Sequence, residues 1–313
     1  MTSEAFPRLE DEVTVAEQAQ VTGRMWVSVL VRLFKLRVVT LLLWVAFGGA
    51  LVAAGPDIWS LRGGMDLLAV FVSGLLAAGG ASALNEYMEQ DLDARMARTR
   101  TRPLPQGLVS PTTALVLGLL ALAAGIGLGW WYRPMLGVFV TAGAFIYIVV
   151  YTLGLKRRSV TNIVIGGAAG SAAVLSGAAA VGRWDHPAAW ILAGLVFLWT
   201  PVHFWALALR YREDYRAAGF PMLPAVTSRK QTAGWILLHA VGTVIAALAL
   251  AAFLHRGGWY LPGAVLLAIW LLRRVGELWR HPADDRRAIR VFVTSNLYLA
   301  ATTLWAMVVS IIP

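Results

Sequence analysis

Three oxygen-bearing side chains, Asn85, Glu89 and Asp93, recur at intervals of four residues directly after a long apolar stretch. On a helix this spacing places all three on one face. The two carboxylates would repel each other unless a cation lay between them, and Mg²⁺ suits such a face because it takes few protein carboxylates. The arginines that follow, Arg98 and Arg102 among them, can bind phosphate oxygens bidentately. These residues predict a magnesium–diphosphate site, although the spacing alone would also fit a solvated helix end.

The apolar stretch before this motif, from Met65 to Leu84, is long enough to cross a bilayer as a helix. The whole chain is 58% hydrophobic and 14% charged, and similar stretches recur along most of its 313 residues. This composition excludes an ordinary soluble domain. The sequence has no cysteine, which excludes disulfides and thiolate metal sites.

Nine membrane-spanning helices are predicted, at 33–55, 64–84, 111–131, 134–151, 161–181, 188–209, 232–254, 259–272 and 291–312. We expect an all-α integral membrane bundle of nine helices around a central cavity open to the cytoplasmic side, where charged backbone can line water. Residues 25–313 would form this single polytopic domain. Residues 1–24 are rich in acids and have no apolar core, so we expect a disordered cytoplasmic tail and not a signal peptide.

Lys and Arg are divided unevenly between the two ends of these predicted spans. Of the 27, only Arg62, Arg133, Arg183 and Arg256 fall opposite the acidic motif. The positive-inside rule then predicts a cytoplasmic N-terminus and an outside C-terminus in the cell (inner or plasma) membrane. Tryptophans gather at the opposite ends like an interfacial belt: Trp59, Trp130, Trp131, Trp184, Trp190 and Trp259. The net charge of +10 is therefore a topology signal, and nucleic acid is not an expected partner.

The string Asn85-x-x-x-Glu89-x-x-x-Asp93, followed by Arg98-Thr-x-x-Arg102-Pro-Leu, resembles the first acidic motif of the UbiA-type intramembrane prenyltransferases. Glu89 stands where that family more often has aspartate, and it supplies the same oxygens on a longer arm. The arginine-containing tail is similar to one branch, the protohaem IX farnesyltransferases (haem O synthases). The resemblance implies that the acidic motif holds Mg²⁺ and that its arginines bind the diphosphate.

Two further stretches resemble the same family. In the first, Lys156 follows a tyrosine by five residues and precedes Asn162, which implies that Lys156 reaches the diphosphate and that Asn162 lines the site. The second begins Trp199-Thr-Pro and resembles the haem branch as far as Asp214. It implies that Asp214 is a fourth metal ligand. The sequence departs from the family pattern at Ala172–Ser176 and at Val202, where prolines are usual.

His203 lies among aromatic residues near the end of a predicted span, and an ionisable group inside a membrane is a functional candidate. Three interpretations are open: a ligand of haem iron, another role in the acceptor pocket, or a neutral histidine bonded to a neighbouring helix. Aromatic faces can stabilise carbocations, and the candidates are Trp199, Phe204 and Trp205.

The resemblance implies Mg²⁺-dependent transfer of a farnesyl group from farnesyl diphosphate to a vinyl group of protohaem IX (haem B), which gives haem O. The implied partners are these two substrates, the lipid bilayer, and a downstream haem-modifying enzyme or terminal oxidase assembly. Two other classes stay open. A prenyltransferase with a quinone precursor or another lipid as acceptor would use the same diphosphate site, and a transporter would carry ionisable residues at mid-membrane.

Two basic segments have simpler interpretations. Arg32, Lys35 and Arg37 precede the first span, where we expect their stems to snorkel to the membrane surface. The charged segment from Arg273 to Arg290 is expected to form an interfacial helix that pairs its own charges.

Overall fold

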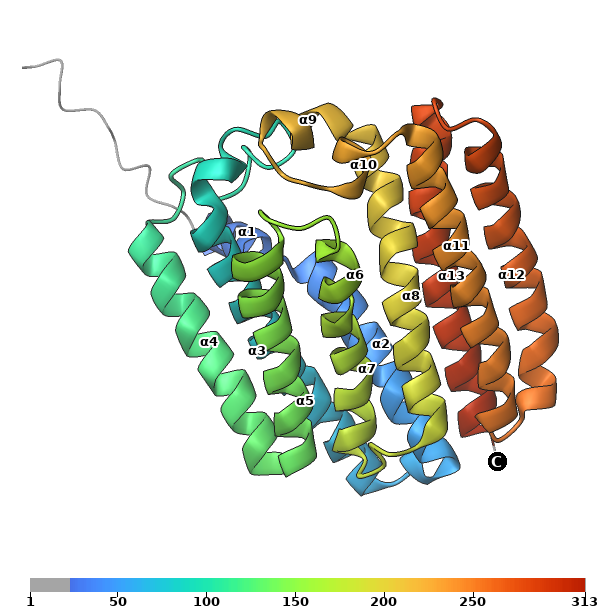
Figure 1. Ribbon diagram of the computed structural model, residues 1–313. Coiled ribbons are helices and arrows are strands. Elements are labelled where there is room, and N and C mark those ends of the chain that lie inside the picture. The colour runs from blue at the N-terminus through green and yellow to red at the C-terminus, as the bar shows by residue number, and fades with distance from the viewer. Residues whose placement is uncertain (1–22, 313) are drawn as a thin grey trace, which may run out of the picture.

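The computed structural model describes residues 23–312, so the predicted tail at 1–24 lies outside the described residues except for its last two. Long helices fill the described part of the chain, in which no strand occurs, and this confirms the all-α class (Figure 1). In chain order the elements are α1 (Gly23–Leu33), α2 (Leu36–Ala54), η1 (Gly55–Ile58), α3 (Leu61–Asp93), α4 (Pro111–Tyr132), α5 (Pro134–Phe145), η2 (Ile146–Leu155), α6 (Asn162–Gly166), α7 (Ala168–Ala180), α8 (Pro187–Arg210), α9 (Arg212–Ala217), α10 (Leu223–Val226), α11 (Arg229–Leu250), η3 (Ala251–Phe253), α12 (Gly257–Arg280) and α13 (Asp285–Ile311).

Within residues 23–312, 8 helical segments are long and apolar enough to cross a membrane, so the chain is a multi-pass membrane protein. They are α2 with η1, α3, α4, α5 with η2, α6 with α7, α8, α11 with η3, and α13, and each matches a predicted span. The remaining predicted span, 259–272, is the apolar part of α12. This helix is about 36 Å long and runs between the two faces beside α11 and α13 (Figure 1), but its last turns are charged and it is not one of the 8 segments. The count of nine spans stays a prediction.

The bundle has two unlike faces, which are named here by their connections. The loop face carries α1, residues 94–110, residues 156–161, α9 and α10, at the top of Figure 1. The turn face carries η1 and the short connections at 181–186 and 254–256. All six tryptophans of the predicted belt are exposed. The longer and more charged connections therefore gather on the loop face.

Helices α2 and α7 pack back to back in the middle of the bundle. A Cβ at Gly49 would overlap the carbonyl oxygen of Val174, and one at Gly177 would overlap the carbonyl oxygen of Ala46. Small residues allow this close approach, as they commonly do between membrane helices. Residues Ala172–Ser176 lie within this contact as regular helix, because the chain lacks the prolines that would interrupt α7 there.

The turn-face end of α3 is anchored by a buried carboxylate. Asp66 is 4% exposed and accepts a hydrogen bond from the Tyr132 hydroxyl at 2.7 Å. The Arg133 guanidinium lies 3.4 Å from the same oxygen. These contacts tie α3 to the junction of α4 and α5. They help to orient the helix whose other end carries Asn85, Glu89 and Asp93.

The charged segment 273–290 does not form a separate interfacial helix, so that expectation was wrong. Its first part completes α12, its last part begins α13, and a turn joins the two helices. Some charges pair locally, as Asp284 does with Arg287 at 3.0 Å. Asp285 instead pairs across elements, with Arg229 at 2.8 Å and with Arg210 at 3.5 Å. Both helices continue through the charged residues because apolar residues recur there at helical spacing.

Candidate active site

The last turns of α3 present the predicted acidic face, and all three of its members are buried. Each accepts a hydrogen bond from one basic side chain: Asn85 from Lys35 at 2.6 Å, Glu89 from Lys156 at 2.5 Å, and Asp93 from Arg102 at 2.5 Å. Burial favours such charge-assisted pairs, because an unpaired carboxylate would be costly away from water. Asp93 is only 4% exposed, so the alternative of a solvated helix end does not fit the structure.

Lys35 joins α1 to α2 and points into the site. Its φ of 49° is the one positive value at a non-glycine residue within 23–312, and the left-handed conformation is strained for lysine. This turn directs the ammonium to Asn85, so the prediction of a snorkelling side chain was wrong for Lys35. Burial lowers the pKa of Lys35 to about 7, with help from Arg102 and Lys156 and against the attraction of Glu86 and Glu89.

A π-helix, η2, delivers the next two polar contacts. The Thr152 hydroxyl donates to the carbonyl of Tyr147, five residues earlier, and accepts from the Asn85 amide at 3.2 Å. Lys156 follows directly and lies 5.5 Å from the centre of the Tyr151 ring. Burial lowers the pKa of Lys156, while Glu89 opposes the shift. Wide π turns are frequent at functional sites, and this one aims both side chains at α3.

Residues 94–110 fold back over the end of α3. The Thr99 hydroxyl donates to the Asp93 carbonyl at 2.9 Å, and the Leu104 amide donates to Glu86 at 3.2 Å. Burial tends to lower the pKa of Arg102, but the Asp93 carboxylate outweighs this effect and the pKa is raised. Glu86 is fully buried, and the sequence reasoning missed it. Its position three residues before Glu89 was the available signal.

The structure does not bring Asp214 into contact with the acidic face. Its neighbour Tyr215 is the residue of α9 that reaches the site, because the Arg98 guanidinium donates to the Tyr215 hydroxyl at 3.2 Å. Burial raises the pKa of Tyr215, against the influence of Arg98 and Arg102. Asp214 is half-buried beside Tyr215, and no contact of its carboxylate with Asp93 is seen. Sequence reasoning did not single out Tyr215, and the assignment of Asp214 to the metal stays a prediction.

The donor set fits a hard cation in its chemistry, since it offers only oxygen. Glu89 Oε1 and Asn162 Oδ1 are buried and have no hydrogen-bond partner among the described residues. Asn162 also donates to the Lys156 carbonyl at 3.3 Å, which places it beside that lysine. Nevertheless, no three His, Asp or Glu side chains in the described chain are grouped as a metal site. Basic groups neutralise the acids one by one.

His203 lies on α8 between two aromatic rings. Its ring centre is 4.6 Å from that of Trp199 and 4.5 Å from that of Phe292 on α13. Nδ1 lies 3.3 Å from Ser295 Oγ, and that hydroxyl already donates to the Phe292 carbonyl at 2.8 Å. A hydroxyl that donates to this carbonyl is free to accept from Nδ1–H, and the tautomer with the proton on Nδ1 leaves the lone pair on Nε2. Such a nitrogen can accept a hydrogen bond or ligate a metal.

The other two aromatic candidates of α8, Phe204 and Trp205, face different neighbours. Phe204 faces Tyr215 at 6.3 Å between ring centres, so it lies toward the Arg98 contact. Trp205 is buried against His239 of α11, at 5.3 Å and nearly perpendicular, and so points to a different neighbour. Val202 is fully buried in the core and leaves α8 continuous.

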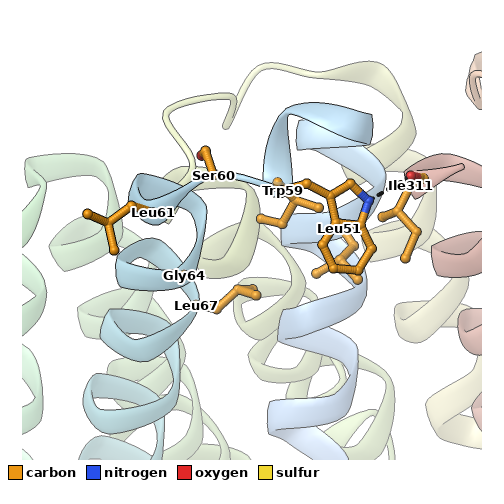
Figure 2. Close-up of a pocket in the computed structure, with 8 residues that line it drawn as sticks. Leu51, Trp59, Ser60, Leu61, Gly64, Leu67 and Ile311 are labelled. Carbon is orange, nitrogen blue, oxygen red and sulfur yellow. Dashed lines mark hydrogen bonds between the residues drawn. The ribbon is translucent and has the colours of Figure 1, made fainter. Parts of the chain in front are cut away.

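A hollow of about 390 Å³ lies at the turn face (Figure 2), at the opposite end of α3 from the acidic motif. The residues that line it are uncharged: Leu51, Ile58, Trp59, Ser60, Leu61, Gly64, Leu67 and Ile311. The Trp59 indole closes one side by donating to the Ile311 carbonyl at 2.9 Å. This lining suits apolar contact and offers no acid, base or phosphate-binding group.

The fold and the site together define a class: a multi-pass α-helical membrane protein with a buried acidic and basic site at one face. Residues 42–307 match the model of the UbiA prenyltransferase family, and the chain belongs to that family. A protein named Protoheme IX farnesyltransferase from Frankia casuarinae is 42% identical over 86% of this chain and 93% of its own length. A protein of the same name from Thermus thermophilus is also 42% identical over 89% of this chain, which spans less than half of that relative (45%).

Solved structures share the fold. A structure described as a digeranylgeranylglyceryl phosphate synthase superposes with a TM-score of 0.73 at 16% identity, over 91% of this chain and 98% of that one. A UbiA homolog from Archaeoglobus fulgidus bound to GPP and Mg²⁺ gives a TM-score of 0.64 at 13% identity, over 89% and 99% of the two chains. At these identities the likeness shows the fold alone.

Proposed function

We propose that the protein transfers a farnesyl group from farnesyl diphosphate to a vinyl group of protohaem IX, giving the hydroxyethylfarnesyl side chain of haem O. The observation that carries the donor half is the buried face of Asn85, Glu89 and Asp93, in which each member meets one basic side chain. The names of relatives 42% identical support the acceptor half.

Asn85, Glu89 and Asp93, with Asp214 from α9, would hold Mg²⁺, which supplies positive charge to the departing diphosphate. A UbiA homolog of the same fold is described as bound to GPP and Mg²⁺, which supports this assignment. The partnerless Glu89 Oε1 supplies a free lone pair for a cation. Asp214 is the weakest member, because its carboxylate makes no hydrogen bond or ion pair with the site residues that the structure describes and is not grouped with the other acids.

The basic side chains that now pair with the acids are suited to bind the diphosphate oxygens. Lys35 and Lys156 offer ammonium groups, and Arg102 offers a planar fork. Arg98 adds a second fork, held in place by Tyr215. Charge that develops on the leaving diphosphate is met by groups already in position, and this stabilises the transition state for breaking the allylic C–O bond.

The remaining steps need no protein nucleophile. The allylic carbon bonds to the terminal vinyl carbon of the porphyrin, which moves the positive charge to the carbon next to the ring. Water adds there, and its proton leaves with the diphosphate. Aromatic faces near the two cations would stabilise them. The contacts of Trp199 with His203 and of Phe204 with Tyr215 support these two residues as candidates, while Trp205 faces His239 of α11.

The test is to incubate purified protein in bilayer discs with Mg²⁺, farnesyl diphosphate and haem B, and to measure the product mass. The expected product is haem B plus one farnesyl group and one hydroxyl. A parallel incubation replaces haem with a quinone precursor. Prenylation of the quinone precursor with none of haem would reject the acceptor while retaining the donor site. No prenyl product with either acceptor would reject both.

A further inference from the structure

A basic hollow of about 550 Å³ opens on the loop face between the end of α8 and the start of α13. It is lined by Arg210, Asp285, Arg286, Ile289 and Arg290. Three guanidinium groups face one carboxylate there, which gives the lining a net charge of +2. This hollow was not foreseen, because the segment was expected to pair its own charges.

Two of these arginines have unused binding capacity. Asp285 is committed to Arg229 at 2.8 Å and to Arg210 at 3.5 Å. The guanidinium groups of Arg286 and Arg290 make no ion pair or hydrogen bond with any residue that the structure describes, and both residues are exposed. A pair of unpartnered guanidiniums in one hollow suits an anionic ligand such as a carboxylate or a phosphate, both of which bind arginine bidentately.

The hollow lies along the contact between α8 and α13, the same contact in which His203 lies. Arg210 follows His203 by seven residues, which is two helical turns and about 10 Å on the same side of α8. On α13, Ile289 lies one turn before Phe292, which contacts the His203 ring at 4.5 Å between ring centres. The contact between α8 and α13 therefore leads from the basic hollow to the aromatic rings of Phe292 and His203 in the membrane.

We infer that this hollow binds the two propionate carboxylates of the haem acceptor, while its ring extends toward Phe292 and His203. The inference rests on the proposed function and deepens it. The net charge of the lining matches two carboxylates, and the contact between α8 and α13 becomes apolar where the porphyrin ring would begin. Anchoring the propionates at the loop face directs the vinyl groups, which lie away from them on the ring, into the bundle.

The test compares haem B with its dimethyl ester, which has the same ring and iron but no carboxylate charge. Binding is followed by the Soret absorbance during titration of protein in bilayer discs. The wild-type protein should bind haem B at least about ten-fold more tightly than the ester, since the ester cannot make charge-assisted hydrogen bonds to the guanidiniums. The Arg286→Gln/Arg290→Gln protein should bind both ligands equally, at the affinity of the ester.

The matched control is Arg273→Gln/Arg280→Gln, which removes two exposed arginines from α12 and should keep the preference for haem B. Farnesyl diphosphate binding by the Arg286/Arg290 variant should equal that of wild type, which shows that the variant is folded. If wild-type protein binds haem B and its ester equally, or if the double variant keeps the preference, the inference is overturned while the proposed function stands. If wild-type protein binds no haem B and forms no farnesylated haem, the proposed function is wrong, and the inference that rests on it is wrong as well.

Discussion

At the scale of single residues, the site is a set of buried polar and charged pairs, and the pair of Asp93 with Arg102 ties the end of α3 to the connection that follows it. Asp93 ends α3 and Arg102 lies in the 94–110 connection, with 2.5 Å between Oδ2 and Nη1. The side chains are 6% and 22% exposed, so water screens the pair only in part. The same carboxylate would therefore serve both the metal and the fold of the connection.

Asp93→Asn should lower farnesyl transfer by orders of magnitude, because one negative charge is lost from the proposed metal site. It should also destabilise the protein by about 1–3 kcal/mol, since Arg102 loses its charged partner while mostly buried. Turnover over a Mg²⁺ series and thermal unfolding in detergent measure the two effects.

The control for this change is the double variant, which carries both Asp93→Asn and Arg102→Gln. Removing both charges should recover most of the lost stability and none of the lost activity, because the buried charge has gone but the ligand has not returned. Near-normal turnover of well-folded Asp93→Asn protein at low Mg²⁺ would contradict the assignment of Asp93 to the metal.

Lys35 allows a second experiment at this scale. Lys35→Met and Lys35→Asn should each weaken farnesyl diphosphate binding, because both remove the ammonium that meets Asn85. Lys35→Asn should be the more stable variant, since asparagine adopts φ near 49° more readily than methionine. Equilibrium binding and thermal unfolding separate these effects. Unchanged donor binding in both variants would show that Lys35 serves the turn alone, and exposed Arg37→Met is the control.

The acidic face could be predicted because its spacing is local, and a helix brings Asn85, Glu89 and Asp93 together by period alone. The roles of Lys35 and Thr152 could not be predicted, because their contacts with Asn85 span 50 and 67 residues of chain. A basic residue before an apolar span is also typical of a snorkelling anchor. Only the left-handed turn at Lys35 distinguishes the two cases, and it leaves no signal in the sequence.

At the scale of elements, the π-helix η2 determines where Lys156 points. Its apolar run from Ile146 to Leu155 predicted a span but gave no sign of wider turns. Deletion of exposed Val149 should convert the segment toward α-helix and rotate the residues that follow it by roughly 100° relative to those before. Lys156 would then lose its contact with Glu89, and donor binding should fall strongly.

Val149→Ala is the matched control for this deletion, because it trims the same side chain and leaves the register unchanged. It should bind farnesyl diphosphate as wild type does. Both proteins are compared by binding and by hydrogen exchange at residues 146–156, where the deletion should alter protection. A deletion variant with wild-type binding would mean that the wider turns do not position Lys156.

At the scale of the whole molecule, the functional groups gather at one end of the bundle. The acidic face, the basic residues that meet it and the hollow between α8 and α13 all belong to the loop face or the turns just below it. The positions of the helices could be predicted from apolar length, since each crossing requires about 20 such residues. The order of the helices around the bundle depends on contacts such as Gly49 with Val174, which no periodicity reveals.

The topology gives the last prediction. Helix α1 lies at the loop face and α13 ends at Ile311 on the turn face (Figure 1), so the described chain begins and ends on opposite faces. With Lys and Arg concentrated on the loop face, that face should be cytoplasmic. A reporter that is active only outside the cytoplasm should be active when fused after Pro313 and inactive when inserted in the 94–110 connection. The reverse pattern would overturn the orientation. Inactivity at both positions would mean an even number of crossings, in which α12 does not span the membrane.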